Sequence, residues 1–327
     1  EPAAGRLVSN SVNPLYNQDF LYSFPGVFVS DLSKGVVLCL LSQLLFSVLY
    51  LFSHWMQPIS GTDVFALRMV VMAAGLWLIT LRLIGLPAML RFVRTHLNSR
   101  RRWLLFLLGT LDVASQFWLF MWAPVNNEGV NVAMGYFLFP VVMVLAGRFW
   151  LKERLNGLQT AALALAGLGV AHEIWTQQAF SWTTLWVCLA YPVYYLYRRE
   201  MKIPALQGLT LDLTLILPFA LAYLLWHADM TAWVLGEPRY WLLLPLLGMA
   251  SAVSMSLNLK SGLLLPVNLF GMLSYVEPAL LFLLAVLVLK TPVQPSAYIT
   301  YGLIWAGLLL LVANGWRSMQ QSRHKQV

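Results

Sequence analysis

Long apolar segments, each close to the length that a helix needs to cross a lipid bilayer, fill most of this chain. A hydrocarbon core about 30 Å thick takes roughly 20 helical residues, and only 10% of the residues are charged. Unpaired backbone groups are costly in hydrocarbon, and runs such as LLLPLLGMA lack the alternation of a barrel strand. We therefore predict an all-α integral membrane protein. Ten transmembrane helices are expected at 35–55, 63–84, 103–123, 128–150, 158–176, 180–197, 208–228, 239–259, 263–288 and 295–315.

Lysine and arginine gather in every second gap between these segments. Residues 82–102, from the end of the second segment to the start of the third, hold six arginines, including the consecutive Arg100, Arg101 and Arg102, whereas the alternate gaps and their edges hold only Arg239 and Lys290. This is the positive-inside pattern, and it predicts that both termini are cytoplasmic. It also accounts for the net charge of +8 without a nucleic-acid partner. We interpret the arginine triplet as a topology determinant, with contact to anionic lipid as the alternative.

Two parts of the chain resemble each other at a nearly constant spacing. Pro140 and Pro278 are 138 residues apart, as are Gly169 and Gly307. These positions fall on paired segments separated by an odd number of crossings, so the two copies are inserted in opposite directions. Such similarity is typical of inverted-repeat transporters; chance likeness between apolar helices is the alternative. We expect a 5+5 inverted repeat, with a cytoplasmic N-terminal extension 1–34, halves 35–176 and 180–316, and a basic tail 317–327.

Several motifs resemble those of a known family. They are GYFLFP at 135–140, QFWLFMWA at 116–123 and YVEP at 275–278. With the ten-segment pattern, they resemble the EamA-type members of the drug/metabolite transporter superfamily, and within these the RarD-like branch, which has an Arg and a Tyr where Arg68 and Tyr194 stand here. The resemblance implies a secondary transporter in the bacterial inner membrane that exports a small metabolite, amino acid or drug by alternating access.

Charged and amide side chains inside the predicted spans are the first candidates for substrate binding. An ionised group at mid-bilayer costs about 2.5–3.5 kcal/mol on insertion scales, so it tends to face a cavity or a partner. Arg68 is expected to bind an anionic group of the cargo or an internal carboxylate, with snorkelling as the alternative. Glu277 is expected either to contact substrate or a proton or to form a structural ion pair. Asp112 and Gln116 share one helix face, expected to line the cavity, although Asp112 equally suits a hydrogen bond to a neighbouring helix.

Aromatic side chains complete the candidate set. They suit a flat or aromatic cargo, or a cation, through stacking and cation–π contact; helix packing or lipid contact is the alternative. Asp212, in contrast, is expected to be solvated or interfacial near the inner start of its span. The remaining candidates for substrate binding are Trp118, Trp122, Asn127, Tyr136, Tyr194 and Tyr275.

Motifs for other chemistry are lacking from the sequence. It contains no Walker loop, no H-E-x-x-H and no nucleotide fingerprint, and Cys39 and Cys188 are interpreted as buried apolar residues. We therefore expect no enzyme, no catalytic residue, no cofactor and no metal. The expected partners are a small-molecule substrate, the lipid bilayer and, if Glu277 carries one, a proton. The alternatives are a membrane-embedded enzyme and a non-transporting adaptor that binds a partner protein or a second copy through residues 1–34.

Overall fold

The computed structural model describes residues 31–126, 128–177, 181–287 and 295–324, and all regular elements in these ranges are helical. This confirms the predicted all-α class for the described part of the chain. Residues 1–30 of the predicted extension lie outside the described ranges. The helices are α1 (Asp31–Trp55), α2 (Gly61–Leu83), α3 (Gly85–His96), α4 (Arg100–Trp122), η3 (Ala123–Val125), α5 (Gly129–Phe149), α6 (Gly157–Gln177), α7 (Trp182–Glu200), α8 (Ala205–Trp226), α9 (Ala228–Gly236), α10 (Pro238–Leu264), α11 (Val267–Leu273), α12 (Val276–Leu287) and α13 (Pro295–His324).

Six of the described helical segments are long and apolar enough to cross a membrane. The chain therefore has the helices of a multi-pass membrane protein. The other predicted spans are occupied by α6, α7, α11 with α12, and α13, and the count of ten spans stays a prediction. The six segments are Asp31–Leu49, Gly61–Leu83, Arg100–Val125, Asn131–Phe149, Ala205–Trp226 and Pro238–Leu264.

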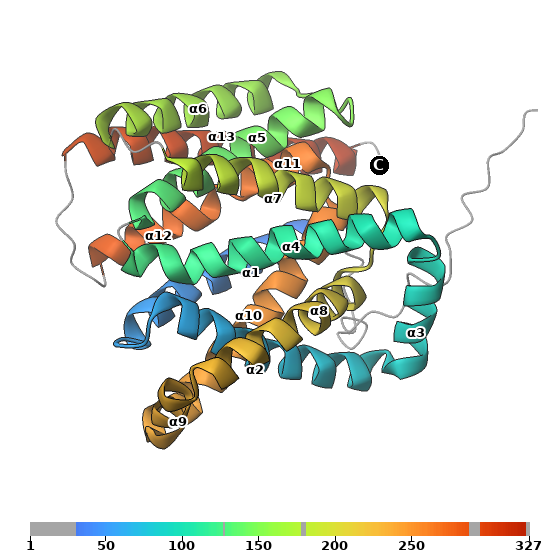
Figure 1. The fold of residues 1–327 in the computed structure, drawn as a ribbon. Helices are drawn as coiled ribbons and strands as arrows, with labels where there is room; N and C mark the ends of the chain where they lie inside the picture. The colour runs from blue at the N-terminus through green and yellow to red at the C-terminus, as the bar shows by residue number, and fades with distance from the viewer. Residues whose placement is uncertain (1–30, 127, 178–180, 288–294, 325–327) are drawn as a thin grey trace, which may run out of the picture.

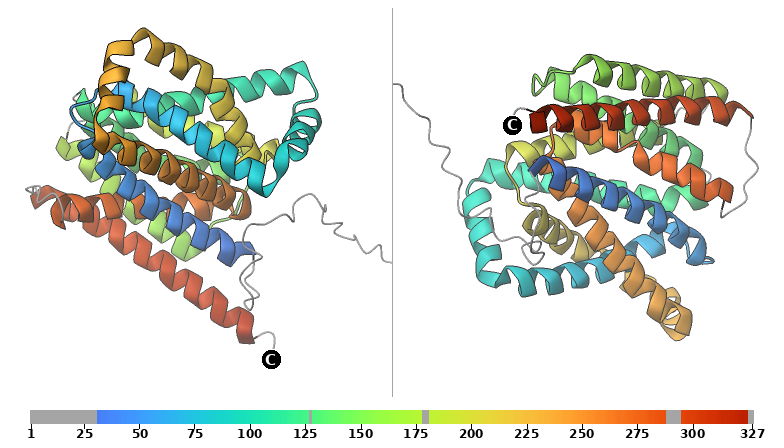
Figure 2. Two further views of the ribbon diagram at one scale, coloured as in Figure 1. Left: turned by 90° about the horizontal axis from the view of Figure 1, so that it is seen from below. Right: turned by 180° about the vertical axis from the view of Figure 1, so that it is seen from behind.

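Helices from the two predicted halves interleave instead of forming two separate bodies (Figures 1 and 2). α1 packs along α10, α2 along α8 and α10, α5 along α7 and α11, and α6 along α13. The largest buried apolar cluster joins α1, α2, α4, α7, α8 and α10. Because helices of one half pack directly on helices of the other, a cavity between these helices is lined by residues of both halves.

The segment predicted as one continuous span at 263–288 is interrupted. α11 ends at Leu273 and α12 begins at Val276, with a turn at Ser274 and Tyr275 between them. Pro278 explains the position of the turn, because a proline lacks the N–H donor and its ring clashes with the carbonyl four residues earlier, here that of Ser274. The interruption places Glu277 in the first turn of α12, at the end of a helix instead of in its middle.

Two helices were not expected from the sequence. α3 lies across the ends of α2 and α4 (Figure 1), within the arginine-rich residues 82–102, and it begins at Gly85, whose φ is +74°. α9 is a short helix between α8 and α10. Both connect longer helices, so they do not change the order of the predicted spans.

Candidate functional site

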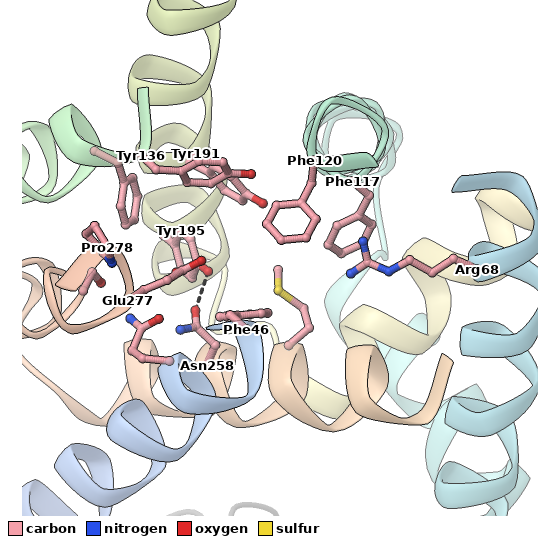
Figure 3. A pocket seen from close by; sticks show the side chains of 14 residues that line it. Phe46, Arg68, Phe117, Phe120, Tyr136, Tyr191, Tyr195, Asn258, Glu277 and Pro278 are labelled. Atoms are coloured by element: carbon pink, nitrogen blue, oxygen red, sulfur yellow. Dashed lines mark hydrogen bonds between the residues drawn. The ribbon is translucent and has the colours of Figure 1, made fainter. Parts of the chain in front are cut away.

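A cavity lies between the two predicted halves (Figure 3). α1, α2, α4 and α5 line it from the first half, and α7, α10 and α12 line it from the second. Seven of its 14 lining residues are aromatic. The space open to the centres of water molecules is about 50 Å³, which is room for a few waters. The described conformation is therefore narrow at this point.

Arg68 of α2 is a buried cation on one side of the cavity, with an exposed fraction of 3%. Its Nε donates to Ser251 Oγ at 2.8 Å, but its Nη1 is buried and has no hydrogen-bond partner among the described residues. The guanidinium carbon lies 5.4 Å from the ring centroid of Phe117 and 5.6 Å from that of Phe120, which suits cation–π attraction. Within the described part of the chain Arg68 forms no ion pair. An anionic group entering the cavity would satisfy its free donor.

Glu277 lines the same cavity from the other half of the chain. Figure 3 shows it on the opposite side from Arg68, close to Tyr195. Its place in the first turn of α12 puts the carboxylate at the positive end of the helix dipole. No ion pair to Glu277 is formed by the described residues. The cavity thus has a basic side chain on one wall and an acidic side chain on the opposite wall.

Hydroxyl and amide groups lie between Arg68 and Glu277. The Tyr195 hydroxyl donates to Asn258 Oδ1, and Asn258 Nδ2 donates to Ser42 Oγ at 3.0 Å. Tyr136 Oη and Gln43 Oε1 are buried without a hydrogen-bond partner among the described residues. Because buried polar groups are nearly always hydrogen-bonded, these atoms are suited to contact water or a bound molecule.

Of the residues predicted from the sequence, Arg68, Tyr136 and Glu277 line this cavity. The structure places Asp112 and Gln116 elsewhere, because their face of α4 meets α7, where Gln116 Nε2 lies 3.5 Å from the Trp186 carbonyl oxygen.

The predicted aromatic candidates other than Tyr136 pack outside the cavity. Trp118 donates to Thr62 Oγ1 at 3.2 Å and stacks on Trp122 with the ring centroids 4.8 Å apart. Tyr275 is 2% exposed and packs in the apolar cluster of α5, α6 and α13. Asn127 lies outside the described residues.

Tyr194 and Asp212 belong to a buried ionic network. Asp212 is fully buried, and the expectation that it is solvated or interfacial is wrong. Arg198 Nη1 lies 2.6 Å from Asp212 Oδ2, Thr110 Oγ1 donates to Oδ1 at 2.7 Å, and the Tyr194 hydroxyl donates to Oδ2 at 2.9 Å. The carboxylate is tolerated in the interior because a cation and two hydroxyls compensate its charge.

Tyr191 was not predicted from the sequence as a cavity residue, whereas Tyr194 was predicted but does not line the cavity. Tyr191 and Tyr195 both line the cavity, and they are one helical turn apart on α7. Tyr194 and Arg198, also one turn apart, face the ionic network instead. The i,i+4 tyrosine pair was the available signal. It does not say which face of α7 meets the cavity.

The structure also locates the two cysteines and the side chains that could bind a metal. Cys39 and Cys188 are buried free thiols. Within the described residues, no group of three or more His, Cys, Asp or Glu side chains could hold a metal ion.

Membrane-length helices around a polar and aromatic cavity are typical of membrane transport proteins, and the comparisons with known proteins agree with this class. The model of the EamA-like transporter family matches residues 33–172. A Haemophilus influenzae protein named an uncharacterized transporter is 55% identical, over 89% of this chain and 97% of its own length. The chloramphenicol-sensitive protein RarD of Pseudomonas aeruginosa is 40% identical, over 89% of this chain and 96% of its own length.

A solved crystal structure, 20% identical, shares the fold, with a TM-score of 0.61 over 86% of this chain and 97% of the other. The chain belongs to the EamA-like transporter family, in the RarD-like branch of the drug/metabolite transporters, as its motifs predicted.

Proposed function

We propose that this protein is a secondary transporter that exports a small molecule across the bacterial inner membrane by alternating access. The observation that carries the proposal is the cavity between the halves, where Arg68 and Glu277 offer a basic and an acidic group that form no ion pair with any described residue. In a transport protein, such groups are suited to a substrate that enters and leaves. The narrowness of the cavity fits an intermediate stage, from which the halves open to either side.

The proposed architecture is ten spans in two oppositely inserted halves, with both termini cytoplasmic. Its spans are α1, α2, α4, α5 and α6, followed by α7, α8, α10, α11 with α12, and α13. A two-fold axis that exchanges the halves requires equivalent contacts in pairs. In agreement with this, α1 packs on α10 as α7 packs on α4, α5 on α7 as α12 on α1, and α2 on α10 as α8 on α4. The two-fold relation supports the inverted repeat.

The proposed substrate is a small molecule with a flat or aromatic body and an anionic group. The anionic group would meet the free Nη1 of Arg68, and the body would lie among the aromatic rings. Glu277 would receive either a cationic group of the substrate or a coupled proton. Amino acids and small aromatic drugs fit this description. Chloramphenicol deserves inclusion among the test compounds because the name of the Pseudomonas relative refers to it.

The test is uptake and release by proteoliposomes that contain the purified protein. Amino acids, nucleosides, short peptides and chloramphenicol would be screened with and without a pH gradient. A variant Glu277→Gln should abolish transport of any compound found while expressing normally. The matched control is Glu237→Gln, which removes a carboxylate between α9 and α10, outside the cavity. Undiminished flux in Glu277→Gln would reject a transport role for this carboxylate, and an absence of flux for every compound class would oppose the proposed function.

A further inference from the structure

One side of α3 is buried against the rest of the fold, and the other side is exposed. Met89 and Phe92 are buried against Phe106 of α4, Ile203 of the connection between α7 and α8, and Leu211 of α8. This contact fixes the orientation of α3 to the rest of the fold. Figures 1 and 2 show α3 lying across the ends of α2 and α4, roughly perpendicular to both. A helix that crosses the ends of membrane-length helices lies along the membrane surface.

The exposed side of α3 carries leucines beside arginines. Leu86 and Leu90 are each 49% exposed and stand one turn apart, and Arg94 continues the same row one turn further. Arg91, also exposed, follows Leu90 on the side away from the buried face. An exposed apolar stripe flanked by arginines is the pattern of a helix in the membrane interface, with its apolar side among acyl chains and its cations at headgroup level.

The surroundings of α3 are strongly basic. Residues 82–102 contain six arginines and no Asp or Glu, and all six arginines are exposed. In the described part of the chain, none of them forms an ion pair. Six exposed cations without an acidic neighbour in this stretch make a strongly positive surface that attracts anions. Such a cluster beside a membrane-spanning helix matches the negative surface of a leaflet that contains anionic lipid.

We propose that α3 binds anionic phospholipid headgroups through Arg91 and Arg94, with Leu86 and Leu90 inserted among the acyl chains. The arginines at either end of the helix, Arg82 and Arg100 among them, extend the same surface. The proposal assigns a specific lipid-binding surface to this gap, in addition to its effect on topology. It depends on the position of α3 and not on the identity of the transported molecule.

The test uses the full-length protein in nanodiscs of phosphatidylcholine, with and without phosphatidylglycerol. Thermal unfolding is followed by tryptophan fluorescence, and retained phosphatidylglycerol is counted by native mass spectrometry. The wild-type protein should unfold at a higher temperature with phosphatidylglycerol and retain it in the mass spectrum. The double variant Arg91→Gln/Arg94→Gln should lose most of the shift and of the retained lipid. High salt should weaken the effect.

The matched control is Arg148→Gln/Arg154→Gln, which removes two exposed arginines from the end of α5 and the loop after it. This control should keep the rise in unfolding temperature with phosphatidylglycerol. The variant Arg91→Lys/Arg94→Lys should keep most of that rise, because it retains both charges, and it therefore distinguishes a loss of charge from a loss of folding. An equal loss in both glutamine variants would overturn the proposal in favour of a diffuse charge effect. A wild-type protein indifferent to phosphatidylglycerol would also overturn it, as expected if the surface binds an acidic protein instead.

Discussion

Gly169 of α6 and Gly307 of α13 meet each other's helices in the same way. A Cβ atom on Gly169 would lie 2.9 Å from the Thr300 carbonyl oxygen, and one on Gly307 would lie 2.9 Å from that of Ala162. Ala162 and Thr300 are 138 residues apart, as the two glycines are. The contact between α6 and α13 therefore repeats itself about a local two-fold axis, at the spacing found in the sequence.

The close approach of α6 and α13 predicts equal effects of substitution at the two glycines. Gly169→Ala and Gly307→Ala should each lower the free energy of unfolding by about 1–3 kcal/mol, because a methyl group has no room against a backbone carbonyl. Gly167→Ala and Gly302→Ala are matched controls on the same helices, since a Cβ at either position meets no atom of the described residues within 4 Å. Thermal unfolding in detergent micelles measures this. Control variants as destabilised as the first pair would contradict the packing argument.

The free donor of Arg68 predicts a loss of transport on its removal. Arg68→Gln should lower transport efficiency about 10- to 100-fold, because a hydrogen bond to a charged group contributes about 1.5–3 kcal/mol. Arg68→Lys should recover only part of this loss, since an ammonium lacks the planar fork of a guanidinium. Initial rates of uptake by proteoliposomes give the measurement, with Arg148→Gln as the exposed control. Wild-type rates in Arg68→Gln would show that the guanidinium does not bind the cargo.

The ion pair of Arg198 and Asp212 predicts that removing one partner lowers the free energy of unfolding more than removing both. Asp212→Ala should cost about 3–5 kcal/mol of stability, because it leaves a buried guanidinium without its counter-charge. The double variant Arg198→Met/Asp212→Leu should recover much of that loss, since no buried charge remains. Chemical unfolding in micelles compares them. A double variant less stable than either single variant would argue that the pair stabilises the fold by more than mutual compensation.

His96 predicts a pH dependence outside the membrane spans. Burial at the end of α3 lowers the pKa of the His96 imidazole below its ordinary 6.5; the nearby Arg102 adds to the shift. The unfolded chain then binds a proton more readily than the folded one, so the contribution of His96 to the free energy of unfolding is complete above pH 6.5. It is lost as the pH falls through the lower pKa of the folded state. His96→Asn should flatten stability against pH in that window, as measured by unfolding at several pH values. An unchanged profile would contradict the shift.

The sequence predicted the structure best where a residue pattern is compatible with only one structural explanation. Apolar length predicted the helices, and Pro278 carried the signal for the break between α11 and α12, since a proline disturbs the turn four residues before it. The rotation of a helix that is apolar on most sides is harder to predict. On α7, neighbouring tyrosines at 191, 194 and 195 look alike in the sequence, and only tertiary packing decides which of them face the cavity.

Contacts between distant segments were also beyond the sequence. Arg198 and Asp212 lie on different helices, α7 and α8, and Asp212 considered alone suggested a solvated or interfacial charge. Their pairing depends on the conformation of residues 201–204, which connect α7 to α8. α3 was not predicted, for a different reason. Gly85 and Pro87 are of residue types that favour turns and loops, but the burial of Met89 and Phe92 stabilises a helix at this position.

The central claim, a cavity that opens to each side of the membrane in turn, is tested most directly by accessibility at Ser274. This small residue lies in the turn between α11 and α12 and lines the cavity. Ser274→Cys would be introduced after Cys39 and Cys188 are replaced by alanine. Membrane vesicles of both orientations would then be treated with a membrane-impermeant thiol reagent. The account predicts modification from either side, each slowed by a transported substrate; modification from one side only, under every substrate condition, would contradict it.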